Sequence, residues 1–171
     1  MTFRLRFRTS KIRTWSDRYS YQNSEAKIEN KIAPAVKGRG WLRKPEFLEI
    51  CRWKTPRTQK LCATNSADFI KIATETAFAS KHERLRIEVL TLLDGVSWPT
   101  ASVFLHFCHS DCYPILDYRA LWSCGAEVPT KYTFAFWNDY TLYCRETARK
   151  ADVGMRTLDR AMWQFSKENQ V

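Results

Sequence analysis

A short turn between two apolar helices could bind a phosphate group. Residues 92–121 read LLDGVSWPTASVFLHFCHSDCYPILDYRAL. Gly95 can take a positive φ without a Cβ clash, which favours a tight hairpin. Ser97 is a good N-cap for the helix that follows, and Pro99 falls in its first turn, where no N–H donor is needed. Main-chain amides of such a hairpin point outward at a slightly positive helix end, where they can hold a phosphate.

Two features of this stretch resemble the helix-hairpin-helix DNA glycosylases. Residues 93–101, L-D-G-V-S-W-P-T-A, are similar to that family's hairpin, whose usual form is L-P-G-V-G-x-x-T-A. Asp117 ends an apolar run eighteen residues after Pro99, the interval at which the endonuclease-III branch carries its catalytic Asp. The resemblance covers about residues 83–125 and implies a catalytic role for Asp117. It also implies DNA-phosphate contacts from the hairpin, at Gly95, Val96, Ser97 and Thr100.

The departures from the family pattern modify this expectation. Ser97 replaces the second hairpin glycine, and Arg119 stands where the family often has His. Pro99 occupies the position of the lyase lysine and has no amine to form a Schiff base. The four-cysteine iron–sulfur spacing is absent. The resemblance therefore implies a monofunctional glycosylase with no metal and no cofactor, although it allows a monovalent cation at the hairpin.

Cleavage of an N-glycosidic bond builds positive charge on the sugar, which a carboxylate at Asp117 could stabilise while it orients a water molecule. The target base must leave the duplex and needs a pocket with aromatic walls. An Asp at this position is also a good N-cap for the residues after it, and the two roles are compatible. The aromatic candidates for the pocket are Trp98, Tyr113, Tyr118, Trp122 and Trp137, and a place in the core is favoured for most of them.

The positive charge lies in the first third of the chain. The 171 residues carry a net charge of +10, and residues 1–60 hold 16 Lys/Arg against 5 Asp/Glu. Such a distribution is expected for a polyanion partner, most often nucleic acid, although a solvated tail would look similar. Phe3, Leu5 and Phe7 alternate with arginines, which indicates a short strand or an extended arm. The basic residues of this arm are Arg4, Arg6, Arg8, Lys11, Arg13 and Arg18.

Apolar periodicity predicts an all-α fold, a compact helical domain built around the helix-hairpin-helix motif. The expected division is a basic extended N-terminal arm at residues 1–22 and one helical, glycosylase-like domain at residues 23–171. Helices are predicted over 24–36, 45–54, 66–80, 83–93, 98–107, 117–124, 131–150 and 156–166. Pro34 is expected to end or bend the first of them.

Cysteine usage and hydropathy indicate a cytoplasmic protein, associated with the nucleoid if the source is a bacterium. The six cysteines are scattered through apolar patterns, which favours reduced core residues. No apolar run approaches the length of a membrane span, and no signal-peptide core is present. His106, Cys108, His109 and Cys112 lie close together, but no second ligand cluster accompanies them, so a zinc site is not expected.

Two classes of function remain open from the sequence. The first is a monofunctional DNA glycosylase that releases a damaged or modified base from double-stranded DNA. The second is a non-catalytic helix-hairpin-helix module that binds DNA. An open, partly desolvated Asp117 beside a cleft would favour the enzyme, and an Asp117 sealed under side chains would favour the module.

Overall fold

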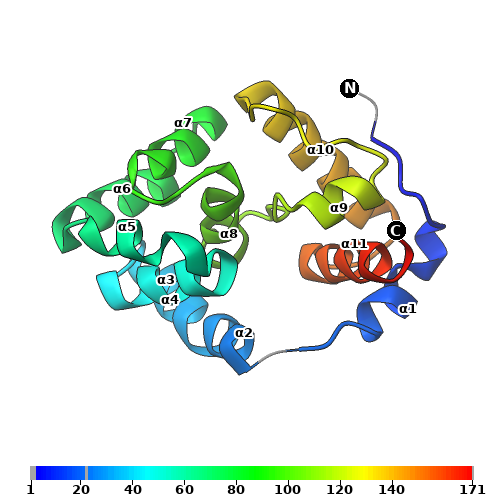
Figure 1. Ribbon diagram of the computed structural model, residues 1–171, viewed down its shortest axis with the longest axis horizontal. Helices are drawn as coiled ribbons and strands as arrows, with labels where there is room; N and C mark the ends of the chain where they lie inside the picture. The colour runs from blue at the N-terminus through cyan, green and yellow to red at the C-terminus, as the bar shows by residue number, and fades with distance from the viewer. Residues whose placement is uncertain (1–2, 22, 171) are drawn as a thin grey trace. The chain divides into compact units, whose positions relative to one another are not determined.

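The computed structural model describes residues 3–21 and 23–170 and confirms the all-α prediction, because the described residues contain helices and no strand. They form two compact units. The first combines residues 3–20 with residues 112–170, and the second lies within residues 21–111. Figure 1 shows the course of the chain through both units. Within the described residues, no helix is both long enough and apolar enough to cross a membrane.

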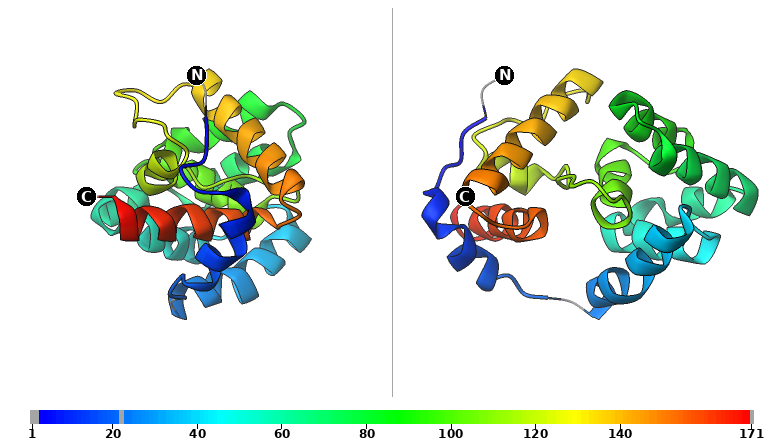
Figure 2. Two further views of the ribbon diagram at one scale, coloured as in Figure 1. Left: turned by 90° about the vertical axis from the view of Figure 1, so that its right-hand side faces the viewer. Right: turned by 180° about the vertical axis from the view of Figure 1, so that it is seen from behind.

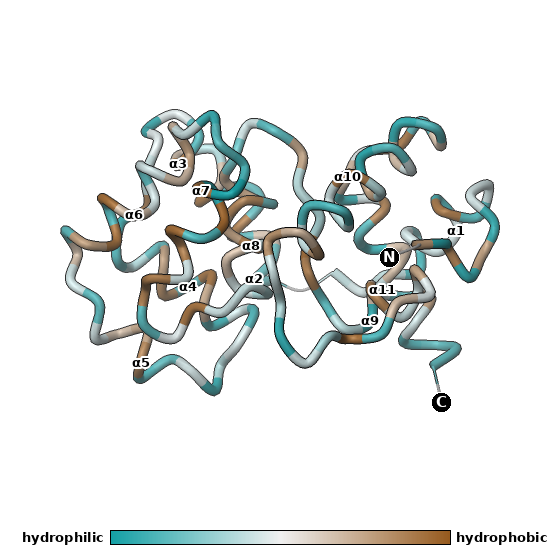
Figure 3. The backbone as a smooth tube through the Cα atoms, turned by 90° about the horizontal axis from the view of Figure 1, so that it is seen from above, coloured by the Kyte–Doolittle hydropathy of each residue, from teal (hydrophilic) through white to brown (hydrophobic). Residues whose placement is uncertain are grey.

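The second unit contains the helices that build the hairpin. They are α2 (Asn23–Lys27), the π-helical η2 (Ile28–Ile32), α3 (Ala33–Arg39), α4 (Lys44–Lys54), η3 (Pro56–Thr58), α5 (Gln59–Thr64), α6 (Ala67–Ala79), α7 (Glu83–Glu88), η4 (Val89–Leu92) and α8 (Trp98–Cys108). Most residues of α8 are buried, including Val103, Phe104 and Leu105, and Figure 3 shows the hydropathy along the chain. Its Phe104 stacks on Phe47 of α4 with ring centroids 5.3 Å apart.

Pro34 does not end its helix, so the first of the two expected effects, an end or a bend, does not occur. The π-helical turn of η2 precedes it, and the chain then continues directly into α3, with Pro34 in the first turn. A π-helical turn changes the hydrogen-bond register, and proline is tolerated in a first helical turn because its missing N–H has no obligatory partner there.

The first unit is built around the last helix of the chain. Its helices are η1 (Thr9–Lys11), α1 (Ile12–Asp17), α9 (Tyr118–Ser123), α10 (Phe134–Lys150) and α11 (Met155–Asn169). Both α1 and α9 pack against α11, as the views in Figures 1 and 2 show. Trp15 of α1 lies edge-on to Phe165 of α11, with ring centroids 5.1 Å apart. This packing places α1 firmly within the unit.

The basic N-terminal segment is therefore part of a core, which differs from the division into an arm and one domain. Residues 3–8 are extended, and the amides of Arg4 and Arg6 donate to the carbonyls of Cys124 and Ser123, each at 2.8 Å. Phe3 is buried against aromatic rings of α10. The apolar alternation serves this packing, while the interleaved arginines face outward.

Buried thiols make the stability of the protein sensitive to alkali. Burial raises the pKa of Cys108 to about 12 from an ordinary value of 9.0. Above pH 9 the unfolded chain loses this proton and the folded chain keeps it, so we expect stability to fall as pH rises from 9 to 12. The loss should approach roughly 1 kcal/mol per pH unit for each such group. Urea denaturation followed by circular dichroism at pH 8, 9, 10 and 11 measures it.

The variant Cys108→Ala removes one of these titrations and provides the control. The free energy of unfolding of this variant should fall less steeply between pH 9 and pH 11 than that of the parent protein. The difference between the two slopes should correspond to about one bound proton. Equal slopes in the two proteins would show that the Cys108 thiol ionises as readily in the folded state as in the unfolded state.

Candidate active site and nucleic-acid interface

The hairpin predicted from the sequence is present in the second unit. Helix α7 and η4 lead into a turn, and α8 begins at Trp98 with Ser97 as its N-cap. The Val96 amide donates to the Leu93 carbonyl at 3.0 Å, and the Ala101 amide donates to the Ser97 carbonyl at 2.8 Å. Gly95 has a φ of +78°, the left-handed conformation that glycine adopts without strain.

Gly95 is also required by the space around it. A Cβ at this position would lie 2.8 Å from the Cys62 sulfur, 2.9 Å from the Cys62 amide nitrogen and 3.1 Å from the Thr58 carbonyl oxygen. Two of these three atoms belong to the backbone at η3 and α5, which cannot move independently. The hairpin therefore packs closely against Thr58 and Cys62, with no room for a side chain at position 95.

Asn65 holds the turn from the other side, and sequence reasoning missed it. Its side-chain amide donates to the Asp94 carbonyl, and its carbonyl oxygen accepts from the Asp94 amide, both at 2.9 Å. Asn65 is buried, so these bonds are shielded from water. An Asn that lies just before a helix N-cap is common in turns, and nothing in its local sequence connects it to a residue 29 positions later.

The predicted phosphate-contact residues differ in what they can offer. Ser97 is exposed, and its side chain makes no capping hydrogen bond to the helix. The side chains of Val96 and Thr100 are buried, so only their main-chain atoms could face a phosphate. Ser97 is thus the hairpin side chain that is placed to act on a ligand.

The chain that leads to Asp117 is held rigidly within the first unit. Arg145 Nε donates to the Cys112 carbonyl at 2.8 Å, and the Tyr140 hydroxyl donates to the Ile115 carbonyl at 3.2 Å. Tyr113 stacks on Trp137 of α10, with ring centroids 5.7 Å apart. These contacts come from one long helix and bring the segment to the start of α9.

Asp117 is the N-cap of α9 and is not sealed in the core. Its Oδ1 accepts a hydrogen bond of 2.9 Å from the Arg119 amide, and the residue is half-buried. The predicted capping role is therefore confirmed, and part of the surface of the residue stays exposed. Burial, together with the negative charge of Asp117, raises the pKa of Tyr132, so this phenol lies within the electrostatic reach of the carboxylate.

The five aromatic residues considered for a base pocket are placed very differently. Tyr113 and Trp137 are fully buried against each other and belong to the core, because their stacking joins residues 112–117 to α10. Tyr118 is 51% exposed, directly after Asp117. Trp122 is half-buried and lies with Tyr118 along a hollow of about 350 Å³. Trp98 is half-buried in the second unit, at the start of α8.

The basic residues of the N-terminal segment fall into two groups. Three have contacts within the first unit: Arg6 donates to the Trp122 carbonyl at 2.6 Å, Arg13 donates to the Asp152 carbonyl at 2.6 Å, and Arg18 pairs with Glu168. Arg4, Arg8 and Lys11 are exposed. A hollow of about 540 Å³ lies along the extended residues, and Lys150 of α10 contributes to its lining.

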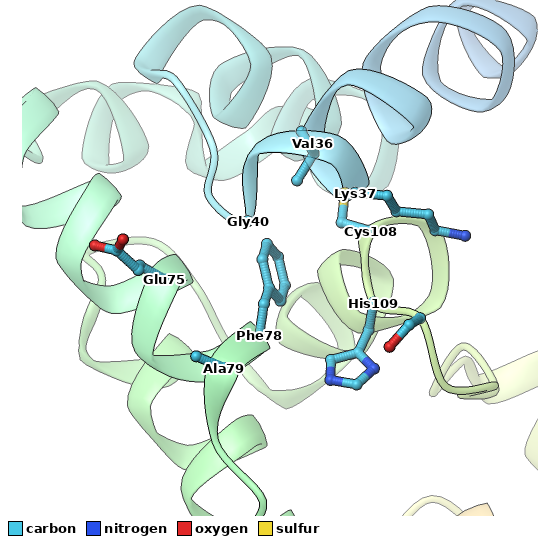
Figure 4. A pocket seen from close by; sticks show the side chains of 9 residues that line it. Val36, Lys37, Gly40, Glu75, Phe78, Ala79, Cys108 and His109 are labelled. Atoms are coloured by element: carbon cyan, nitrogen blue, oxygen red, sulfur yellow. The ribbon is translucent and has the colours of Figure 1, made fainter.

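The His and Cys residues near the end of α8 do not form a metal site in the part of the chain that the structure describes. No three His, Cys, Asp or Glu side chains gather there in a way that could hold an ion. Burial raises the pKa of the Cys108 thiol to about 12. Figure 4 shows Cys108 and His109 beside Phe78 around a hollow of about 250 Å³.

Comparison with known proteins gives one structural match. No family model matches the chain, and no curated protein matches it in sequence. The fold is similar to that in the crystal structure of the Methanocaldococcus jannaschii 8-oxoguanine glycosylase/lyase in complex with a 15mer DNA containing 8-oxoguanine. The TM-score is 0.52 at 14% identity, and the match covers 95% of this chain and 82% of that one. The chain therefore has an all-α, glycosylase-like fold.

Proposed function

We propose that this protein is a monofunctional DNA glycosylase that releases a damaged or modified base from double-stranded DNA. The observation that carries the proposal is the place of Asp117, a half-buried residue at the start of α9 in a glycosylase-like fold. The rigid segment that leads to it supplies the positional precision that catalysis requires.

The proposed reaction is hydrolysis at the C1′ carbon of a nucleotide. As the bond from C1′ to the base nitrogen breaks, its electron pair leaves with the base, and the sugar becomes an oxocarbenium ion that the Asp117 carboxylate stabilises. A water oxygen then bonds to C1′. The water gives one proton to Asp117 or to solvent, and the departing base takes up one proton, so the products are the free base and an abasic site.

Strand cleavage is not part of the proposed activity. A lyase needs an amine that attacks C1′ and forms a Schiff base. Pro99, in the first turn of α8, has no such amine. The resemblance allows a monovalent cation at the hairpin, and the proposed chemistry makes no use of one.

We propose that the hairpin and the exposed basic residues of the N-terminal segment bind DNA phosphates. Deleting that segment would remove Phe3 and Ile12 from the core, so substitution is the better test. The double variant Arg4→Gln, Arg8→Gln should retain the fold and weaken DNA binding. The slope of log Kd against log salt concentration should decrease by roughly 1.8, the value expected for the loss of about two phosphate contacts. Fluorescence anisotropy from 50 to 300 mM salt measures it.

The matched control for the arm is Lys81→Gln, Arg84→Gln, which removes the same charge from exposed positions of the second unit. Its salt slope should remain that of the parent protein. If the arm variant and this control shift the slope equally, the effect is one of net charge, and the arm does not contact DNA.

The alternative function is a non-catalytic DNA-binding module. It is favoured by the fact that Asp117 already serves as a helix cap, which would account for an Asp at this position. A helix cap can stay partly exposed, so the half-buried Asp117 is compatible with both functions, and base release decides between them.

The experiment that tests the proposal is incubation with a panel of duplexes. Each duplex carries one oxidised, deaminated, alkylated or otherwise modified base, and 8-oxoguanine is included because the similar structure holds it. Mass spectrometry identifies any released base. Release from at least one duplex, with the strand left intact, is the expected result. No release from any of them, in a protein that binds DNA, would support the non-catalytic module.

A further inference from the structure

One face of α11 carries a regular series of basic and aromatic side chains. Arg156, Arg160, Trp163 and Lys167 follow one another at intervals of four, three and four residues, which places them on the same side of a helix. The opposite side holds buried residues such as Leu158 and Met162. On the basic face Lys167 is exposed, whereas Arg156, Arg160 and Trp163 are half-buried.

Aromatic rings and cations alternate along this face. Arg156 and Arg160 lie over the ring of Tyr19, at 5.8 and 5.6 Å from its centroid. Lys167 lies 5.2 Å from the centroid of the Trp163 ring. The rings of Tyr19 and Trp163 meet edge to face, with their centroids 5.3 Å apart. Tyr19 follows α1, which packs on α11 as Figure 2 shows.

Arg119 of α9 extends the series towards Asp117. Its guanidinium lies 5.5 Å from the centroid of Trp163 and 5.0 Å from that of Tyr118. Its main-chain amide donates to the Asp117 carboxylate. The series thus begins on α11 and reaches the first turn of α9, where the proposed catalytic group is located. We call Arg119, Arg156, Arg160, Lys167, Tyr19 and Trp163 the cation–aromatic ladder.

The ladder concentrates positive charge. Asp159, which is buried, forms an ion pair with Arg156 at 2.5 Å. Arg119, Arg160 and Lys167 bring three further positive charges to the same face. The part of the ladder on α11, from residue 156 to residue 167, is about 16 Å long. This length is the axial rise of about five base pairs of DNA.

A cation that is stacked on a ring is well prepared to bind phosphate. A guanidinium over an aromatic face loses less side-chain entropy on binding, because its orientation is already restricted. The ring faces of Tyr19 and Trp163 are already covered by cations, so bases are poorly able to stack there. Such an arrangement fits a phosphodiester backbone and carries no base readout.

We propose that the cation–aromatic ladder binds the phosphodiester backbone of DNA. It would give the first unit a sequence-independent DNA-binding site, in addition to the hairpin of the second unit. The inference rests on the proposed function in taking DNA as the ligand, but it requires no base release. A strand held along α11 and by Arg119 would lead to the start of α9, where Asp117 lies.

The test compares the double variant Arg160→Gln, Lys167→Gln with the control Lys81→Gln, Arg84→Gln, which loses the same charge from the second unit. Anisotropy titrations use an undamaged 20-base-pair duplex at several salt concentrations, and circular dichroism confirms the fold of each variant. The ladder variant should lower the salt slope by about 1.8, and the control should leave it unchanged.

A second variant separates the ladder from a simple accumulation of charge. Trp163→Leu keeps every cation and removes the ring under Lys167 and Arg119. Affinity should fall severalfold at constant salt slope, because the cations remain but are no longer held in place. Unchanged affinity in a Trp163→Leu protein that circular dichroism shows to be folded would contradict the preorganised ladder.

The other outcomes each decide the inference. A duplex slope that is unaffected by Arg160→Gln, Lys167→Gln overturns the ladder even if the protein releases a base. A reduced slope in a protein that releases no base supports the ladder and removes the enzyme. If Arg160→Gln, Lys167→Gln weakens binding to vesicles with anionic headgroups and leaves duplex binding unchanged, the ladder as a DNA site is overturned in favour of a membrane surface.

Discussion

Asp117→Asn should lower the rate of base release by roughly a hundredfold to a thousandfold, the usual effect of removing one group that stabilises charge in a transition state. Asparagine has the size of aspartate but no negative charge to place beside the sugar cation. DNA binding should persist or tighten, because an anion near the phosphates has been removed. Single-turnover release of the base that the duplex panel identifies is the measurement.

The same variant should change stability very little. Asparagine caps helices as well as aspartate does, and its Oδ1 can accept the bond from the Arg119 amide. The free energy of unfolding should therefore remain within about 1 kcal/mol of the parent value. Asp139→Asn, which makes the same charge change at an exposed position of α10, should leave base release unaltered and serves as the control.

Tyr132 reports independently on the charge of Asp117. The pKa of Tyr132 is raised by burial and, to a smaller extent, by this carboxylate. Asp117→Asn removes the repulsion between the carboxylate and the phenolate, so the pKa of Tyr132 should fall towards its ordinary value. Ultraviolet titration of the parent and the variant, each with and without Tyr132→Phe, isolates this phenol from the other tyrosines.

These measurements separate the two proposed functions. A large loss of base release with unchanged melting temperature assigns Asp117 to catalysis. If the parent releases no base and Asp117→Asn alters only thermal stability, Asp117 is a cap and the protein is a binding module. A covalent adduct trapped by borohydride in the parent protein would show that an amine other than the family's lysine has taken the lyase role.

The local features of the hairpin and of Asp117 could be predicted because they depend on neighbouring residues. The positive φ of Gly95 and the caps at Ser97 and Asp117 follow from short-range chemistry. The longer helices were predicted within a few residues, since each has an apolar face with helical period. The similarity in fold then confirmed the all-α prediction that these patterns supported.

The features that sequence reasoning missed depend on partners far along the chain. Residues 12–17 form α1 because Ile12 and Trp15 pack against residues near the C-terminus, and six residues show no clear period of their own. Tyr113 and Trp137 were candidates for a pocket because both are aromatic, but they stack on each other in the core. The same composition is compatible with either role, and only the tertiary contacts distinguish them.

The glycine of the hairpin gives the second large effect. Gly95→Ala should destabilise the protein by about 3 kcal/mol. The left-handed conformation of an alanine costs about 1–2 kcal/mol, and a Cβ within 3 Å of the Cys62 sulfur and amide nitrogen adds a cost of about 1–3 kcal/mol for overpacking. Because the turn must shift, affinity for duplex DNA should fall as well. Urea denaturation and anisotropy on the same preparation measure both effects.

Two other glycines of the second unit separate the causes of that effect. Gly40 has a φ of +88° and open space around it, so Gly40→Ala should show the conformational cost alone, about 1–2 kcal/mol. Gly38 lies in α3 with open space and no positive φ, so Gly38→Ala should stabilise the helix by up to about 1 kcal/mol. The expected order of stability is Gly38→Ala, then Gly40→Ala, then Gly95→Ala. If Gly95→Ala costs no more than Gly40→Ala, α5 yields to the new methyl group, and the close approach of the hairpin to Cys62 does not constrain the turn.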